Sequence, residues 1–463
     1  MESWNFSTVM VTALGGFTLA LLAVETVRFL RAGRAGRRAP KTMRKVLGWL
    51  AIRVVIGLVF TVGATMTAGV MQGLDALHRV DTGEIEARLK ESLANTREEP
   101  IRFGRTLGHD GFFVSGAGID PDDRDPPANL QGRFVEMEPD PGDRLIYVFG
   151  GSSVVLQEYK RTFPARLEGL LRPDYGLFDV FNFGACSLDS FSVKRRAIQA
   201  MRRRKPDLVI IYAGHEDYNN PYRQVIKSHF FLIRNSPILF EMLKTYYLGL
   251  YLPVSNLLSK YPSEPAYWAF LESWLEPTLN HWLQGLGLID IPQKAFDGFN
   301  RVILDAAKRN YLALIDEAKQ RGVPVVLITP VCNLASRPYG IKDRALKLYD
   351  AGMAEKRYRE RIELLVQARD AEAFTFEVRA KSDLMAWFRG LDDGKNVFTL
   401  DLEKLLMERR FQFDDTDFGD YSHFSNMVHQ VVAEAILDFL KRRKVCCGLR
   451  PNENDGRRNQ GRD

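Results

Sequence analysis

The pattern of apolar and polar positions divides the chain into an N-terminal part with two long uncharged runs and a larger part with short apolar runs. Residues 5–24 and 54–71 contain no charged side chain. The first run has the roughly 20 residues that a helix needs to cross about 30 Å of hydrocarbon. The second reaches that length with residues 49–52 if Arg53 snorkels or faces its partner helix. The pattern therefore predicts a hairpin of two transmembrane helices within residues 1–74.

The charge between the two runs predicts how this hairpin is oriented. Residues 26–50 carry eight Lys and Arg residues and no acidic residue. Because basic residues near span ends stay on the cytoplasmic side, this loop is expected inside, with both termini and the rest of the chain outside. Two alternatives remain: one span with one buried helix, or a secretory signal peptide. A signal peptide is disfavoured because Lys and Arg follow the first apolar run instead of preceding it.

Five short apolar runs, each bounded by turn residues, predict buried strands in the larger part of the chain. They are residues 145–149, 180–183, 207–212, 325–329 and 396–400. Helical patterns cover residues 301–321 and 427–441. Strands that alternate with helices imply parallel pairing, and continuous apolar strands imply a sheet covered on both faces. Folds of this kind place their sites at the carboxyl ends of the strands.

Three segments do not fit this alternation. Residues 75–140 are polar, with acidic and Pro-rich stretches, and are predicted to form a stalk leading into peripheral structure. Residues 218–300 are rich in aromatic side chains and predict a helical insertion over the sheet, serving as a packed cap, a lid or a face against a bilayer or lipidic substrate. Residues 441–463 predict a flexible basic tail. The α/β domain itself is expected to span 141–440.

Composition and charge exclude several classes of protein. With 463 residues, 46% of them hydrophobic and 26% charged, the chain is globular. The net charge of +6 comes from the loop 26–50 and the tail 441–463, so it does not indicate nucleic-acid binding. Four Cys residues without a Cys-x-x-Cys pair exclude a disulfide scaffold and a Cys-rich zinc module. No phosphate loop, dinucleotide fingerprint or metal-ligand pattern occurs, so no cofactor is predicted.

Residues capable of chemistry follow three of the predicted strands and precede the last helix. These residues are Gly150-Gly151-Ser152-Ser153, Gly184, Gly214-His215-Glu216-Asp217, and Asp420 with His423. An Asp three residues before a His can orient the imidazole, which can then take a proton from a serine hydroxyl. Each motif alone is a weak signal, because a turn serine can simply cap a helix and an Asp-His pair can lie on the surface.

Together and in this order, the motifs resemble those of the SGNH/GDSL hydrolase superfamily. The resemblance covers about 141–220 and 301–440, and more loosely 102–112. It implies a three-layer α/β/α fold with a parallel sheet of about five strands. It also implies the roles of the matching positions: Ser152 as nucleophile with Ser153 as the neighbouring candidate, Asp420 and His423 as its triad partners, Gly184 and Ser152 backbone N–H groups in the oxyanion hole, and Gly151, His215, Asp217 and Asn333 around them.

The third motif departs from the family, which has Asn where this chain has Glu216. An Asn amide donates a hydrogen bond to the oxyanion, whereas an ionised Glu repels it. Losing one such donor costs about 2.7–4 kcal/mol of barrier. Three outcomes are open: Glu216 is protonated by its site and donates, an Asn at 219, 220 or 333 replaces it, or the site is slow or inactive.

The resemblance leads to an expected function. It implies a serine esterase, deacylase or O-acyltransferase, anchored in a bacterial inner membrane and acting outside the cytoplasm on acylated envelope glycans or lipids. The expected partners are the lipid bilayer, that substrate and other envelope-biosynthesis proteins. The main alternative is a weak or inactive SGNH-like scaffold of a surface polysaccharide or lipid assembly. A two-span sensor is a third, disfavoured because the cytoplasmic loop is short.

Overall fold

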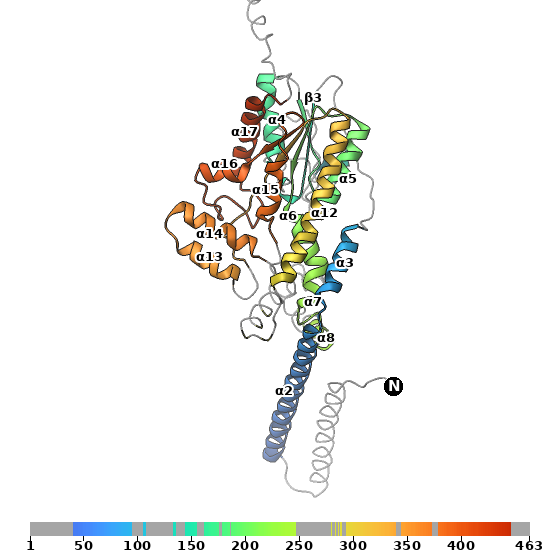
Figure 1. Cartoon of the computed structure of the whole chain (residues 1–463). Coiled ribbons are helices and arrows are strands. Elements are labelled where there is room, and N and C mark those ends of the chain that lie inside the picture. The colour runs from blue at the N-terminus through green and yellow to red at the C-terminus, as the bar shows by residue number, and fades with distance from the viewer. Residues whose placement is uncertain are drawn as a thin grey trace, which may run out of the picture. The chain divides into compact units, whose positions relative to one another are not determined.

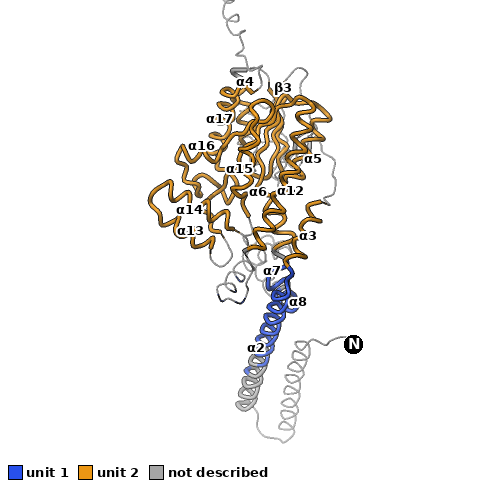
Figure 2. Tube along the Cα trace, viewed as in Figure 1, with its two compact units in different colours: residues 1–81, 228–289 blue, residues 82–227, 290–463 orange. Residues whose placement is uncertain are grey.

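The chain forms two compact units, residues 1–81 with 228–289, and residues 82–227 with 290–463 (Figure 2). The predicted first span 5–24, most of the insertion and the tail beyond 445 lie outside the described residues. The computed structural model describes residues 40–94, 105–107, 133–135, 144–154, 162–175, 178–185, 187–246, 279, 283, 286, 288, 293–338, 344–372 and 378–445.

The first unit contains one long helix, α2 (Pro40–His78), which includes the predicted second span. The hydroxyls of Thr61 and Thr65 donate to backbone carbonyls four residues earlier at 2.8 Å, so these polar groups are satisfied within the helix. Several large apolar side chains of α2 are exposed: Ile52, Val59, Phe60, Val62, Met66 and Met71. Among the residues that the structure describes, no helix combines the length and apolarity needed to cross a membrane.

Helix α8 (Pro237–Tyr246), from the aromatic-rich insertion, packs against α2. A Cβ atom at Gly69 would lie 2.6 Å from the side chain of Leu239, so a larger residue there would push α8 away. Gly73 has the same relation to Leu232, at 2.7 Å. The described residues of the insertion between 228 and 289 therefore belong to the unit of α2, whereas residues 293–300 belong to the other unit.

The second unit is built on a parallel five-stranded sheet, and the predicted three-layer α/β fold is confirmed. The strand order is β4-β3-β5-β6-β7. All five strand predictions are correct to within two residues at either end, because each strand is a continuous apolar run that is almost entirely buried. The strands are β3 (Arg144–Gly150), β4 (Phe178–Asn182), β5 (Leu208–Tyr212), β6 (Val325–Ile328) and β7 (Val397–Leu400).

Two pairs of helices cover the two faces of this sheet (Figure 1). On one face α5 (Ser190–Arg203) packs against α12 (Gln293–Gln320), and on the other α4 (Phe163–Tyr175) packs against α17 (Asn426–Arg443). The segment predicted as a stalk includes α3 (Thr82–Ala94), which packs against α12 and buries Ile85 and Leu89. It also includes the antiparallel pair β1 (Arg105–Leu107) and β2 (Arg133–Val135).

Four further helices follow β6, in a stretch where the sequence pattern made no helix prediction. They are α13 (Arg344–Ala354), α14 (Tyr358–Asp370) and α15 (Ser382–Gly390) before β7, and α16 (Leu402–Glu408) after it. Helices α13 and α14 pack against each other as a hairpin.

The order of the strands reverses at β3: the next strand along the chain, β4, lies on one side of β3, and the following strand, β5, lies on its other side. The carboxyl ends of β3 and β5 therefore form the edge where parallel α/β folds place their sites. The register pairs Gly150 with Tyr212, and a Cβ atom at Gly150 would lie 2.1 Å from the Tyr212 carbonyl oxygen. Only glycine fits this approach, which brings the residues after the two strands side by side.

Candidate active site

Ser152 begins a single helical turn, η2 (Ser152–Val154), directly after the buried Gly151. The Val154 N–H closes this turn by donating to the Gly151 carbonyl at 3.2 Å. Ser152 is half-buried, whereas its neighbour Ser153 is only 6% exposed. Of the two candidate nucleophiles, Ser152 therefore has the more accessible side chain.

The loop after β4 lies against this turn and is held by Asn182. The Asn182 amide donates to the Val154 carbonyl at 2.8 Å, and its oxygen accepts the Gly184 N–H at 2.9 Å. The N–H that the family resemblance assigns to the oxyanion hole is thus already engaged, and an oxyanion would have to share or displace that bond. Sequence reasoning missed Asn182, although a polar residue ending an apolar strand just before Gly184 is a recognisable signal.

The third motif begins at Gly214, whose φ of 140° disfavours any residue with a Cβ atom. Glu216 follows in the short helix α6 (His215–Pro221) and is 6% exposed. Its Cγ atom lies 3.4 Å from the point where a Cβ atom of Gly151 would stand. The structure therefore brings Glu216 against the first motif, beside Ser152.

Burial raises the pKa of Glu216 above its ordinary value, and the charge of Asp189 adds to this effect. A hydrogen bond from the Asn219 amide to Oε2, at 3.2 Å, and the positive charges of Arg223 and His423 act in the opposite direction. His423 is thus one of the charged groups that lower the pKa of Glu216.

Asp420 and His423 form a compact pair in the loop before α17. The Asp420 Oδ2 and His423 Nδ1 atoms are 2.5 Å apart, and Oδ1 accepts the backbone N–H groups of Ser422 and His423 at 2.9 Å each. Partial burial acts to raise the pKa of Asp420, but these hydrogen bonds and the imidazole charge outweigh it and lower the pKa to about 2. Since an ionised carboxylate only accepts, Nδ1 carries the ring proton and Nε2 is the basic position.

The loop that carries this pair is closed by backbone hydrogen bonds. The Gly419 N–H donates to the His423 carbonyl at 2.8 Å, and the Ser425 N–H donates to Asp417 at 2.9 Å. From the β6 side, the Asn333 N–H donates to the Tyr421 carbonyl at 2.9 Å. The His423 side chain stays 29% exposed, so the imidazole is fixed in place yet accessible.

Among the described residues, the Ser152 hydroxyl makes no hydrogen bond to His423.

The asparagines considered as substitutes for the oxyanion donor all have other partners. Asn333 donates its amide to Asp415 at 2.7 Å. Asn220 donates to the Ser187 carbonyl at 2.9 Å, and Asn219 donates to Glu216. Their side chains position loops and the Glu216 carboxyl.

His215 and Asp217, the other two polar residues of the third motif, are buried and hydrogen-bonded to the rest of the fold. His215 Nδ1 accepts the Ala380 N–H at 3.2 Å, so Nε2 donates to the Val331 carbonyl at 3.1 Å, and burial lowers the pKa of this imidazole to about 3. Asp217 accepts the Ser190 N–H at 2.8 Å and the Tyr311 hydroxyl at 2.9 Å. Burial raises the pKa of Asp217 to about 7. These contacts position α6.

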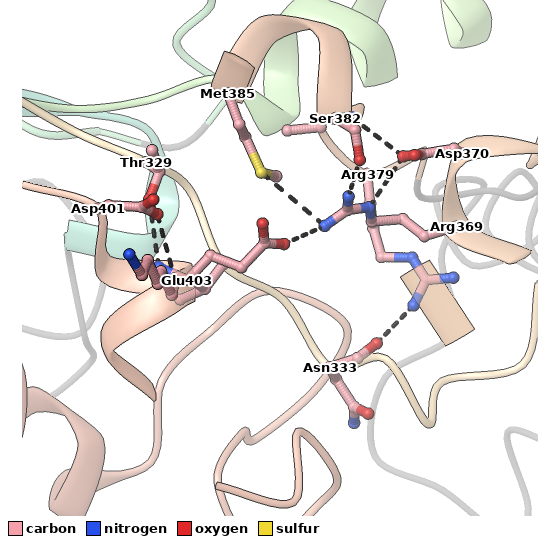
Figure 3. A network of polar contacts seen from close by, with 12 residues as sticks. Thr329, Asn333, Arg369, Asp370, Arg379, Ser382, Met385, Asp401 and Glu403 are labelled. Atoms are coloured by element: carbon pink, nitrogen blue, oxygen red, sulfur yellow. Dashed lines mark hydrogen bonds and ion pairs between the residues drawn. The ribbon is translucent and has the colours of Figure 1, made fainter. Parts of the chain in front are cut away.

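A buried network of ions lies behind the site, and sequence reasoning missed it entirely (Figure 3). Arg369 is fully buried and pairs with Glu403 at 2.6 Å, and Arg379 pairs with Glu372 at 2.8 Å. Arg379 also donates to the Asn333 carbonyl, which connects the network to the loop of Asp420 and His423. The scattered charges of this stretch look like surface positions in the sequence, so nothing in their spacing indicated a network.

Cys332 is a buried free thiol close to the network, and Cys186 lies outside the described residues. In the part of the chain that the structure describes, no group of His, Cys, Asp and Glu residues could hold a metal ion.

Comparison with known proteins gave no match among family models and none among curated proteins. Solved structures do match. A protein assigned to the G-D-S-L family of lipolytic proteins from Desulfitobacterium hafniense has 12% identity and a TM-score of 0.32, covering 65% of this chain and 99% of its own. A protein assigned as an acylhydrolase from Bacteroides fragilis has 12% identity and a TM-score of 0.33, covering 68% and 92%.

A third solved structure, a lipase/acylhydrolase from Enterococcus faecalis, has 12% identity and a TM-score of 0.27, with coverage of 65% of this chain and 96% of that one. The three similar structures are thus named as lipolytic proteins or acylhydrolases.

Proposed function

We propose that this chain is a serine esterase or O-acyltransferase in which Ser152 is the nucleophile, His423 the general base and Asp420 the residue that orients it. One observation carries the proposal. Asp420 Oδ2 holds Nδ1 of His423 at 2.5 Å, which makes Nε2 the basic position of an imidazole whose side chain is 29% exposed. An accessible serine, a basic nitrogen and a fixed carboxylate on one sheet edge suit acyl transfer.

In the first half-reaction, the Ser152 oxygen forms a bond to the acyl carbon and its proton passes to Nε2 of His423. The electron pair of the carbonyl moves onto its oxygen. When this pair returns, the bond to the alcohol breaks and the alcohol takes the proton from His423. Backbone N–H groups of the turn after Gly151 are the expected oxyanion donors, joined by Gly184 if it releases Asn182.

In the second half-reaction, water or a sugar hydroxyl gives its proton to His423 and attacks the acyl carbon. The bond between the acyl carbon and the Ser152 oxygen then breaks, and Ser152 takes the proton back from His423. Water yields a free acid, whereas a hydroxyl acceptor yields a new ester. We propose acylated envelope glycans or lipids as the substrate class. This placement follows from the anchor proposed for residues 5–24 and 49–71, with the basic loop 26–50 on the cytoplasmic side.

The anchor is supported by the large apolar side chains that α2 exposes, including Val59 and Phe60 at 65% and 68%. In membranes from an expressing bacterium, the full chain should resist extraction by alkaline carbonate. Protease added outside right-side-out vesicles should digest the α/β domain. Release of the chain by carbonate, or protection of the domain from outside protease, would contradict the anchor or its orientation.

A fluorophosphonate probe tests the nucleophile. Wild-type protein should be labelled, Ser152→Ala should not, and Ser153→Ala is the matched control that should be labelled because Ser153 is buried. Loss of labelling only in Ser153→Ala would reassign the nucleophile. Absence of both labelling and ester hydrolysis in folded wild-type protein would favour the scaffold alternative, for which Glu216 in place of Asn is the supporting feature.

A further inference from the structure

Glu216 occupies the most unusual place in the proposed site, and its role deepens the proposed function and rests on it. The residue is 6% exposed, and its Cγ atom lies 3.4 Å from the point where a Cβ atom of Gly151 would stand, next to the residue proposed as nucleophile. Oε2 accepts the Asn219 amide at 3.2 Å, whereas Oε1 makes no hydrogen bond to any described residue. Asn219 is itself held by the Val378 N–H, which donates to its Oδ1 at 3.3 Å. The Asn219 amide therefore points its donor at Glu216.

This arrangement distinguishes the two carboxyl oxygens of Glu216. In a protonated carboxyl, one oxygen accepts and the other carries the proton. Because Oε2 accepts the Asn219 amide, the proton belongs on Oε1, the oxygen without a described partner. Glu216 then offers one O–H donor beside the Ser152 turn, as an Asn amide would offer an N–H.

The charges around Glu216 come from three other elements. Arg223, in the π-helical turn η4 (Tyr222–Ile226), and His423, in the loop before α17, favour the ionised form. Asp189, the N-cap of α5, favours the protonated form, and so does burial, which is the largest effect. The pKa of Glu216 is therefore raised, in the direction that keeps the O–H donor at higher pH.

We propose that Glu216 is a catalytic residue whose protonated Oε1 donates a hydrogen bond to the acyl carbonyl oxygen as Ser152 attacks it. The proton stays on Glu216 throughout, and the only proton transferred in this step is the one that passes from Ser152 to His423. The hydrogen bond strengthens as negative charge develops on the carbonyl oxygen, which stabilises the transition state more than the bound ester. An ionised Glu216 has no donor and repels the same oxygen.

The consequence is a dependence on pH that a permanent donor would lack. Activity should fall as pH rises through the raised pKa of Glu216, since deprotonation removes the donor and adds a repelling charge. Glu216→Gln keeps a neutral amide donor of the same length at every pH and should remove this fall. Glu216→Ala lacks any donor and should lower kcat/KM about 10²–10³-fold at the pH values where wild-type Glu216 is protonated, and the difference should shrink as pH rises.

The experiment measures p-nitrophenyl acetate hydrolysis by the detergent-purified full chain between pH 4.5 and 9, after subtracting the rate of Ser152→Ala. Wild type should lose activity at the alkaline end while Glu216→Gln does not. The loss in Glu216→Ala should fall mainly on kcat. Circular dichroism and the thermal unfolding midpoint verify that each variant is folded.

Labelling by the fluorophosphonate separates the two levels of proposal. If the folded wild type is not labelled, Ser152 is not a reactive nucleophile. The proposed function then fails, whatever the role of Glu216. If wild type is labelled but Glu216→Gln keeps the same alkaline fall, or Glu216→Ala keeps full activity, the role of Glu216 is overturned. A folded Glu216→Gln that is more than about 100-fold slower at all pH values would show that the ionised form is needed, and would also overturn it.

Discussion

Two regions of the α/β unit bury charged side chains, and they differ in how those charges are paired. In the network behind the site, Glu403 binds the buried Arg369 guanidinium at 2.6 Å (Figure 3). Glu372 binds the buried Arg379 guanidinium at 2.8 Å. At the carboxyl end of β5, Glu216 is just as buried but receives one amide hydrogen bond at 3.2 Å. Paired buried ions hold segments together, whereas a buried acid without a counter-ion changes its pKa and becomes available for chemistry.

Asp420 is intermediate between the ion-paired buried acids and Glu216, because its partner is the imidazole of His423. Its substitution should give the largest effect on activity. Asp420→Asn replaces the acceptor of the His423 Nδ1–H by an amide that allows the other tautomer. We expect a loss of about 10⁴-fold in kcat, measured on a p-nitrophenyl ester, with a much smaller change in the unfolding midpoint because the Asn oxygen can still accept the Ser422 and His423 N–H groups. Asp438→Asn, an exposed position on α17, is the control. A loss below tenfold would mean that Asp420 does not orient the base.

The buried network should respond through stability instead of catalysis. Arg369→Met removes the closer and fully buried guanidinium partner of Glu403, leaving only Arg389 at 3.3 Å, and should lower the free energy of unfolding by about 3 kcal/mol, measured by urea denaturation. Arg389→Met is the matched control, because Arg389 is a partly exposed partner of Glu403 and Asp401. Equal, small losses in both variants would remove the distinction between the two regions.

Asp217, next to Glu216 in the sequence, gives the smallest expected effect and a specific sign. Its pKa is raised from 3.8 to about 7 by burial, so the stability that its neutral form contributes is complete below about pH 3.8 and is lost as pH rises through about 7. Asp217→Asn should therefore flatten the decline of the unfolding midpoint between pH 4 and pH 8. The Asn oxygen can still accept the Ser190 N–H, and the Tyr311 hydroxyl can accept from the amide.

Parallel pH curves for wild type and Asp217→Asn would show that Asp217 is ionised throughout. Measuring the unfolding midpoint of Glu216→Gln against pH in the same way compares how the protonation of Glu216 and of Asp217 affects stability.

The sheet could be predicted from the sequence because each strand is an uninterrupted apolar run that ends at a turn. The site could be predicted only as a set of motifs after strands: Gly150 and Gly214 marked the turns, but not that Glu216 lies against Gly151. The orientation of His215 and Asp217 into the fold depends on partners at Ala380 and Tyr311, more than 90 positions away. The pairing of Arg369 with Glu403 depends on tertiary packing and left no periodic signal.

The identity of the nucleophile is the claim on which the other roles depend, and a trapped intermediate tests it most directly. The full-length protein would be mixed with p-nitrophenyl acetate, quenched in acid within milliseconds, digested with pepsin and analysed by mass spectrometry. We predict one acetyl group on the peptide that contains Ser152, located on Ser152 by fragmentation and absent from Ser152→Ala. Continued turnover with the acetyl group on another residue, or undiminished turnover in Ser152→Ala, would contradict the account.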